Sequence, residues 1–182
     1  MRKHALIFVC CLMFPSFIKS ASIKKIEMHR VERDTLFDEY RDRAHRYLSR
    51  SIFNGTQMSG EMLASCAKHV YSKYGVFIPV ELALAQAQLE TRMGTGGRAG
   101  HKTNPFNLGE WADRSTLQFK TTEEGVMAYY DLLARRYFTG GRTLDDLYKC
   151  FIDIDGFYYG LPDYGQEIKK HVQFVQYWLD NN

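Results

Sequence analysis

The segment Pro79-Val-Glu-Leu-Ala-Leu-Ala-Gln-Ala-Gln-Leu-Glu90-Thr-Arg-Met-Gly94 decides the fold of this chain. Pro79 suits the first turn of a helix, and Gly94 suits its termination. Between them, apolar side chains surround most of the helix circumference, so no broad face is left for solvent. The pattern therefore predicts a helix from Pro79 to Met93 that runs through the middle of a domain.

Amphipathic helices are predicted on both sides of this central segment, and hardly any stretch has the alternating pattern of a convincing strand. Ser59 can cap a helix that Gly75 ends, while Thr121 and Glu124 form a capping box before another apolar stripe. The chain is therefore expected to be mainly α. The predicted helices cover residues 32–50, 59–75, 79–93, 121–140, 143–151 and 163–179.

The first 20 residues have the layout of a secretory signal peptide. Arg2 and Lys3 precede an apolar run over residues 5–14, and small residues surround Ser20. That run is too short to serve comfortably as a transmembrane helix, and no later stretch is apolar enough to span a bilayer. We therefore expect an exported protein with no stable membrane span after processing.

Two parts are expected after the leader. Residues 21–58 are predicted to form an N-terminal helical extension, and residues 59–182 a compact helical domain around the central helix. The helix at 32–50 carries many charges and packs by one face. Its other face is a candidate docking surface for a protein partner.

The charge balance gives little support to nucleic acid as a partner. The whole chain has 24 basic and 21 acidic residues, but residues 1–20 contain three of the basic ones and no acid. The mature chain therefore has 21 of each. Without a basic surplus, the electrostatic attraction that drives binding to phosphates is weak.

No motif for a metal or a cofactor is found in the sequence. The six histidines show no paired ligand spacing, and the glycine-rich stretch 94–100 lacks the Lys-Ser/Thr ending of a phosphate-binding loop. Residues 153–156 have some of the spacing of a calcium loop, but they lack its third acid and its distal glutamate. We expect neither a cofactor nor a metal.

Cys66 and Cys150 are the two cysteines that remain after the leader. In an oxidising compartment, two such cysteines form a candidate disulfide. The alternative is two small buried side chains on separate helices. The sequence gives no distance between the two sulfur atoms, so both interpretations stay open.

Glu90 is the polar residue that the apolar pattern of the central helix explains least. It lies in the last turn, where the negative end of the helix dipole disfavours a carboxylate. Partial burial acts in the same direction, so both effects favour the protonated acid. Gln86 lies four residues earlier on the same face, within reach of a hydrogen bond. The alternative is a solvated glutamate that pairs with Arg92 or Arg98.

Four segments follow one another along the chain: Leu84-Ala-Gln-Ala-Gln-Leu-Glu90-Thr-Arg-Met-Gly94, Asn104-Pro-Phe-Asn-Leu-Gly-Glu-Trp111, Phe119-Lys-Thr-Thr-Glu-Glu-Gly-Val-Met-Ala-Tyr-Tyr130 and Tyr164-Gly-Gln-Glu-Ile168. In this order they resemble the bacterial glucosaminidase family, glycoside hydrolase family 73, which includes flagellar peptidoglycan hydrolase domains and Bax-type proteins. The resemblance covers about residues 76–180. It rests on the order of the segments, since no single one is specific.

The resemblance implies a lysozyme-like helical domain, in which a substrate groove runs past the acid on the central helix. It also implies peptidoglycan glycan strands as substrate, with hydrolysis of the bond from N-acetylglucosamine to N-acetylmuramic acid. Glu90 takes the place of the general acid, which must hold a proton and deliver it to the leaving oxygen, and Tyr164 that of the active-site tyrosine. The residues expected to bind substrate are Gln86, Phe106, Asn107, Trp111, Tyr130 and Tyr159.

The aromatic members of this set offer flat apolar faces to sugar rings and N-acetyl methyl groups. For Tyr130, a place in the core is the equal alternative, because most tyrosines at helical spacing are core residues.

The sequence leaves two possibilities for the second catalytic group. Many relatives hold a second carboxylate in a longer lobe, whereas only residues 109–121 fill that space here. Glu110 and Asp113 are the acids in this short, reduced lobe, and either could activate water or stabilise an oxocarbenium-like state. In the other route, the N-acetyl oxygen of the substrate attacks the anomeric carbon while Tyr164 orients it.

The resemblance thus predicts an exported, cell-wall-associated enzyme, periplasmic or extracellular, that acts as a peptidoglycan β-N-acetylglucosaminidase. A lytic transglycosylase or a muramidase on the same fold is the first alternative. A transglycosylase needs a single acid/base residue, although Glu90-Thr-Arg fits its usual Glu-Ser motif less well. A wall-binding or assembly module that has lost catalysis is the alternative from another class.

Overall fold

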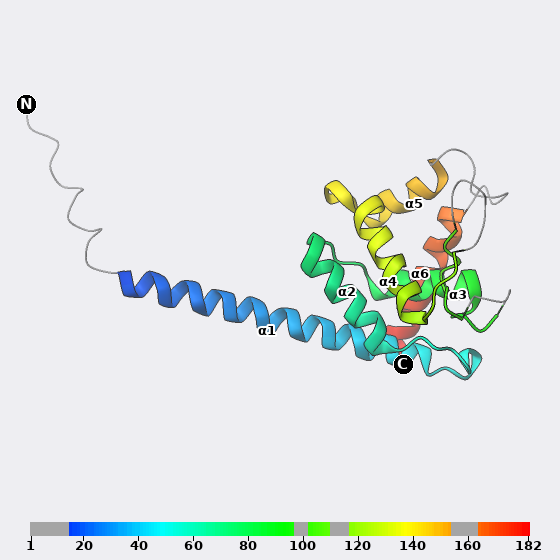
Figure 1. The fold of residues 1–182 in the computed structure, drawn as a ribbon, viewed down its shortest axis with the longest axis horizontal. Helices are drawn as coiled ribbons and strands as arrows, with labels where there is room; N and C mark the ends of the chain where they lie inside the picture. Colours follow the sequence, from blue (N-terminus) through cyan, green and yellow to red (C-terminus); the bar gives the residue numbers. More distant parts are fainter. Residues whose placement is uncertain (1–14, 97–101, 110–116, 154–163) are drawn as a thin grey trace, which may run out of the picture. The chain divides into compact units, whose positions relative to one another are not determined.

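The computed structural model of the chain describes residues 15–96, 102–109, 117–153 and 164–182, without the side chains of residues 15–31 and 150–153. Six α-helices and no strand are found in these ranges, so the prediction of a mainly α fold is confirmed (Figure 1). The helices are α1 (Pro15–Leu48), α2 (Gly60–Tyr74), α3 (Val80–Thr91), α4 (Thr122–Leu132), α5 (Leu144–Asp153) and α6 (Tyr164–Asn181). Short 3₁₀ turns at Ser51–Phe53 and Thr139–Gly141 and a π-helical turn at Leu133–Tyr137 connect them.

The chain divides into two units, residues 1–36 and 37–182, and α1 contributes to both. In the first unit the described side chains, those of residues 32–36, are exposed. In the second unit, α1 contributes Phe37, Tyr40, Ala44 and Tyr47 to the hydrophobic core. The later part of α1 is therefore a core element of the 37–182 unit. In the part of the chain that the structure describes, no helix is both long and apolar enough to cross a membrane.

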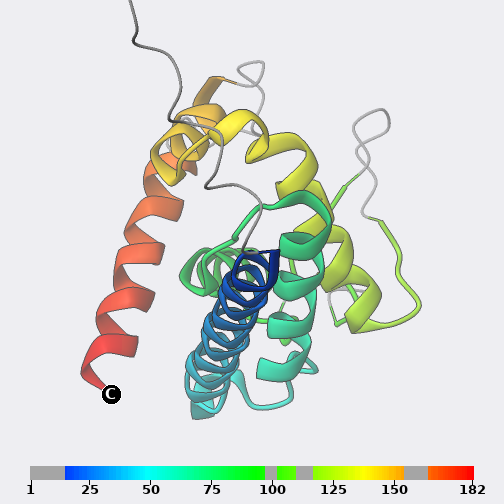
Figure 2. The same cartoon turned by 90° about the vertical axis from the view of Figure 1, so that its left-hand side faces the viewer.

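The central position predicted for the segment after Pro79 is confirmed. Every residue of α3 from Leu82 to Ala87 is buried, and α3 packs against α6. Within the 37–182 unit, Figure 2 shows α6 (red) on one side and α2 and α4 (cyan-green to yellow-green) on the other, with α3 between them. A helix that is apolar all round needs neighbours on several sides. Here α6 packs along α3, while α1 and α4 bond to it through Tyr47–Gln88 and Tyr129–Gln86.

Local capping places the helices largely where the sequence predicts them. The Ser59 hydroxyl accepts a hydrogen bond from the Met62 amide at 3.1 Å, and Gly75 ends α2 with a left-handed φ of 69°. The Thr121 hydroxyl accepts from the Glu124 amide at 3.1 Å, and the Glu124 carboxylate accepts from the Lys120 amide at 2.8 Å. The predicted capping box is present, with its acid reaching one residue further back than the cap itself.

The end of α3 differs from the prediction, because the helix stops at Thr91 and not at Met93. Three successive residues then have left-handed φ angles, namely Arg92 at 52°, Met93 at 59° and Gly94 at 76°. This turn places the Met93 side chain in the core, where it is fully buried. Burial of a large apolar side chain offsets backbone conformations that non-glycine residues rarely adopt.

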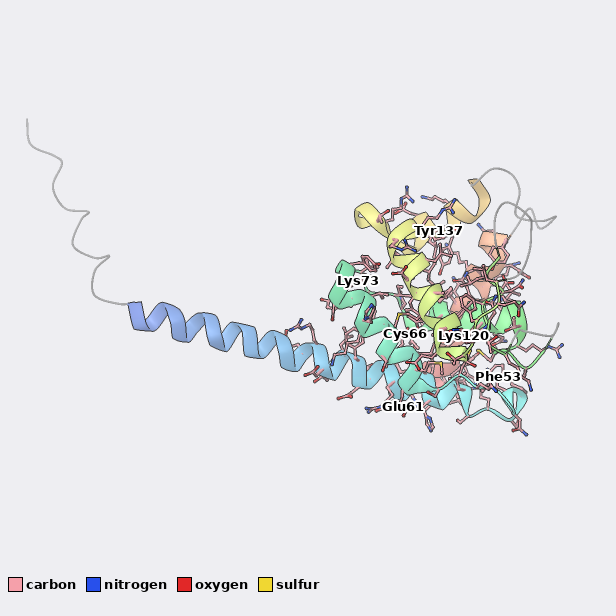
Figure 3. The ribbon with its side chains drawn as sticks, viewed as in Figure 1. Phe53, Glu61, Cys66, Lys73, Lys120 and Tyr137 are labelled. Carbon is pink, nitrogen blue, oxygen red and sulfur yellow. The ribbon has the colours of Figure 1, made fainter. Side chains whose placement is uncertain are left out.

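Cys66 is a buried free cysteine, so the candidate disulfide with Cys150 is not formed in this structure. Its side chain points into the core beside the hydroxyls of Tyr40 and Tyr130. In Figure 3 it lies inside the helical unit, whereas Glu61 and Lys73 of the same helix lie at the periphery. Burial raises the pKa of the Cys66 thiol to about 12, which makes it an unreactive core residue. The side chain of Cys150 lies outside the described residues.

Candidate functional site

The carboxyl group of Glu90 is the meeting point of three separate segments. The Tyr164 hydroxyl, from the first residue of α6, donates a hydrogen bond to Glu90 Oε1. The Asn107 side-chain amide donates to Glu90 Oε2 at 3.3 Å. These partners lie 74 and 17 residues away from Glu90 in the sequence. The structure thus brings together three of the predicted site residues around one carboxyl group.

The antiparallel packing of α3 and α6 creates this meeting point. The last turn of α3 lies beside the first turn of α6, which puts Glu90 next to Tyr164. At the opposite ends, Arg43 bonds both Glu81 near the start of α3, at 2.6 Å, and Asp180 near the end of α6, at 3.3 Å. Contacts at both ends fix the register of the two helices. The position of the Tyr164 hydroxyl is therefore set by helix packing and not by a loop.

Asn107 reaches Glu90 from a tight turn over residues 104–108. Its φ angle is 50°, a left-handed value that asparagine tolerates better than most residues. The Asn107 amide N–H donates to the Asn104 carbonyl at 3.1 Å, which closes the turn. The side chain of Asn107 is exposed, whereas Tyr164 is buried and Glu90 is half-buried. Among the described residues, the Glu90 carboxyl group is therefore covered on the side of Tyr164 and partly exposed on the side of Asn107.

Gln86 and Phe106 lie beneath Glu90 and do not bond to it. Phe106 is buried and stacks on the Tyr129 ring, with centroids 3.6 Å apart and planes 2° from parallel. The Tyr129 hydroxyl donates to Gln86 Oε1. The expected hydrogen bond between Gln86 and Glu90 is thus replaced by one to Tyr129. These three side chains form a packed layer next to Glu90, and the binding of substrate by Gln86 and Phe106 stays a prediction.

Tyr130 is a core residue, so its prediction as a wall of the substrate groove is wrong. Its side chain is fully buried, and its hydroxyl bonds that of Tyr40 at 2.6 Å. Burial raises the pKa of both hydroxyls, so both stay protonated. The neighbouring Tyr129 points instead toward Gln86. Adjacent residues of a helix point about 100° apart, and helix packing decided which of the two faces the site.

The other predicted site residues lie outside the described residues. These are Glu110, Asp113, Trp111 and Tyr159. The first two are the candidate second carboxylates, and the last two are candidate sugar-binding aromatics.

The alternative role for Glu90, an ion-paired helix end, finds no support among the residues that the structure describes. Arg92 is exposed and forms no ion pair with Glu90, and Arg98 lies outside the described residues. Glu90 is held by two neutral groups instead. The Asn107 NH2 group donates to the carboxyl group, and the amide oxygen could accept from it after a flip of the amide, whereas the Tyr164 hydroxyl can donate or accept without such a change. The site can therefore keep its geometry when Glu90 carries a proton and when it does not.

The pattern of the sequence did not single out Thr91 and Asn104, which are both buried near Glu90. The Asn104 side chain donates to the carbonyls of Leu108 and Leu117 and accepts from the Leu108 amide, each at 2.9 Å. A signal for it was present, since asparagine before proline is typical of a turn. No comparable signal marks Thr91, because threonine after an acid is common.

Among the described residues, no three His, Cys, Asp or Glu side chains are grouped so as to hold a metal ion. Comparison with known proteins finds no matching family model, no matching curated protein and no matching solved structure. The geometry around Glu90 is therefore the structural observation that bears on function.

Gly125 of α4 packs closely against the backbone of Thr103, directly before the turn that carries Asn107. A Cβ atom added at Gly125 would lie 2.0 Å from the backbone oxygen of Thr103. We expect Gly125→Ala to destabilise the protein by about 3 kcal/mol, because backbone must move to admit the methyl group. Thermal unfolding should show a decrease in Tm of roughly 6–12 °C.

Gly140→Ala is the matched control for that substitution. Gly140 has a left-handed φ of 72°, but an added Cβ meets nothing within 4 Å. The expected cost is about 1–2 kcal/mol from backbone strain alone. Equal losses of stability in the two variants would contradict the close packing of α4 on this turn.

Proposed function

We propose that this protein is a glycosidase that cleaves the glycan strand of peptidoglycan, as a β-N-acetylglucosaminidase with Glu90 as the general acid. The observation that carries the proposal is the half-buried Glu90 carboxyl group, held by the Tyr164 hydroxyl and the Asn107 amide. These residues belong to three of the four segments that resemble the glucosaminidase family. Export to the cell wall, through the predicted leader, is part of the same proposal.

In this mechanism, Glu90 donates its proton to the glycosidic oxygen as the bond to the anomeric carbon breaks. The sugar acquires oxocarbenium character, and the leaving sugar departs with the proton. Tyr164 and Asn107 hold the carboxyl group in one orientation, so no change of side-chain rotamer is needed before proton transfer. The resulting carboxylate accepts hydrogen bonds from both groups, and it can then take a proton from the attacking water.

The group that stabilises the positive charge distinguishes two routes. In one, Glu110 or Asp113 supplies a second carboxylate. In the other, the N-acetyl oxygen of the substrate forms a cyclic intermediate while Tyr164 orients it. Both routes belong to the proposal, and no cofactor or metal enters either.

A lytic transglycosylase is the second candidate function. A single carboxyl group with two neutral partners is sufficient for that reaction, in which one residue acts first as acid and then as base. The reaction differs in its product, because the muramic acid closes on its own hydroxyl and no water is added.

Mass spectrometry of the soluble fragments from purified peptidoglycan tests the proposal. We expect fragments with a reducing N-acetylglucosamine end. A reducing muramic acid end would indicate a muramidase, and an anhydromuramic end a transglycosylase; either would overturn the assignment of the bond. Protein that sediments with the wall and releases no fragment would overturn catalysis and support the wall-binding alternative.

A further inference from the structure

We propose that Thr91 is a positioning residue of this site, whose hydroxyl group fixes the distance between Glu90 and the turn that carries Asn107. The inference concerns the geometry of the Glu90 site, and its catalytic consequence rests on the proposed function. Thr91 does not contact the accessible side of Glu90. Its hydroxyl group bonds to backbone near Glu90 and to backbone near Asn107, the two residues that share a hydrogen bond.

The Thr91 hydroxyl joins three pieces of backbone. It donates to the Pro105 carbonyl oxygen at 2.6 Å and lies 3.3 Å from the Ala87 carbonyl oxygen, while it accepts from the Gly94 amide at 2.7 Å. A hydroxyl has one hydrogen, and the short distance assigns it mainly to Pro105. Thr91 is 2% exposed, so water cannot replace these partners without opening the core.

The two ends of this connection are close to the catalytic carboxyl group. Thr91 follows Glu90 directly, and Pro105 is two residues before Asn107. The turn between Pro105 and Asn107 is rigid, because Asn104 bonds to Leu108 and Leu117 and also accepts the Asn107 amide N–H. A rigid turn that is attached at Pro105 moves as one body. The Thr91 hydroxyl therefore sets the position of the Asn107 side chain relative to Glu90.

The backbone after Thr91 needs this support. Arg92 and Met93 have left-handed φ angles of 52° and 59°, which cost about 1–2 kcal/mol each for residues with a side chain. Such conformations persist where surrounding contacts determine them, and they are concentrated at functional sites. Here the Gly94 amide bonds to the Thr91 hydroxyl, and the Met93 carbonyl accepts from the Thr56 hydroxyl at 2.7 Å. Both threonines hold the same turn, but Thr91 also reaches the Asn107 turn.

That difference supplies a matched set of variants. Thr91→Val keeps the size and branching of the side chain and removes the hydroxyl. Thr91→Ser keeps the hydroxyl and removes a methyl group. Thr56→Val removes the hydrogen bond to the Met93 carbonyl and the one accepted from the Met58 amide at 3.1 Å, and it leaves the Pro105 connection intact. Tm is measured for all three, so that loss of geometry is separated from loss of folding.

The first readout does not require activity. In the NMR spectrum, Glu90→Gln should shift the side-chain amide signal of Asn107, because the two groups share a hydrogen bond. We expect this shift to disappear when Glu90→Gln is made in the Thr91→Val background. It should persist in the Thr91→Ser and Thr56→Val backgrounds. Persistence of the full shift in Thr91→Val, or its loss in Thr91→Ser, would overturn the inference.

The second readout is the rate of glycan cleavage. We expect Thr91→Val to lower kcat about 100-fold with KM little changed, since a misplacement of about 1 Å costs that much in a positioned site. Thr91→Ser should restore most of kcat, and Thr56→Val should keep it. Wild-type-like kcat in Thr91→Val would overturn the inference. A wild-type protein that cleaves no glycan contradicts the proposed function instead, and the NMR result still decides the role of Thr91.

If Thr91→Val does not fold, the role of the Thr91 hydroxyl is tested with Thr91→Ser. The serine must then keep both the amide shift and kcat near wild-type values, and loss of either in a folded serine variant would overturn the inference.

Discussion

Glu90→Gln is expected to abolish nearly all release of soluble fragments from purified peptidoglycan. General acid catalysis contributes about 10²- to 10⁴-fold to a rate, and glutamine has no proton of suitable acidity to give. Glutamine has nearly the same shape, and its oxygen can still accept a hydrogen bond from Tyr164 or Asn107. We therefore expect the Tm to change little, so that the lost activity is chemical in origin.

Glu61→Gln is the control for that experiment. Glu61 is exposed in the first turn of α2, so the same change of charge occurs away from the site. Its rate of release should equal that of the wild type. Full activity in a folded Glu90→Gln variant would remove Glu90 from the mechanism. Sedimentation with insoluble wall material, measured for the same variants, separates binding from cleavage.

Tyr164→Phe is expected to lower kcat about 10- to 100-fold. The substitution removes one hydrogen bond to a charged group, which is worth about 1.5–3 kcal/mol, and each 1.4 kcal/mol of barrier is a factor of ten. Of the hydrogen bonds from Tyr164 and Asn107, Glu90 then keeps only the one from Asn107, at 3.3 Å. The orientation of its carboxyl group is therefore less well fixed. KM should change less than kcat, because the buried Tyr164 ring is retained.

Tyr177→Phe is the matched control, because Tyr177 lies on the same helix and is 69% exposed. Removal of its hydroxyl should change neither kcat nor Tm. A Tyr164→Phe variant with wild-type kcat would show that the hydroxyl contributes only to stability. In the substrate-assisted route, the wild-type protein should cleave a glycan that lacks the N-acetyl group far more slowly than the N-acetylated glycan, because the N-acetyl oxygen is the nucleophile.

Much of the fold could be predicted from local features of the sequence. The apolar run after Pro79 predicted the central helix, and Ser59, Gly75 and Thr121 marked helix ends that the structure confirms. These features act through neighbouring residues, so one sequence window contains them. The extent of α1 was harder to predict, because its residues 15–31 have no regular apolar face in the sequence.

The candidate site could be predicted in part because its members lie in separate motifs with recognisable chemistry. An acid on an apolar helix pointed to Glu90, and the resemblance to a family supplied Tyr164, Phe106 and Asn107. The structure places the polar members on one carboxyl group and Phe106 in the layer below. Their catalytic roles stay predictions.

The sequence by itself determined the mainly α class, the central helix and the acid at its end, since each depends on residues within a few turns of one another. Only the tertiary structure decided which groups touch that acid, that Tyr129 and not Tyr130 faces Gln86, and that Cys66 is a free, buried thiol. The partners of Glu90 lie 17 and 74 residues away, and their distances depend on how α3 packs against α6. Periodicity shows which face of a helix is buried, but it does not show which neighbour buries it.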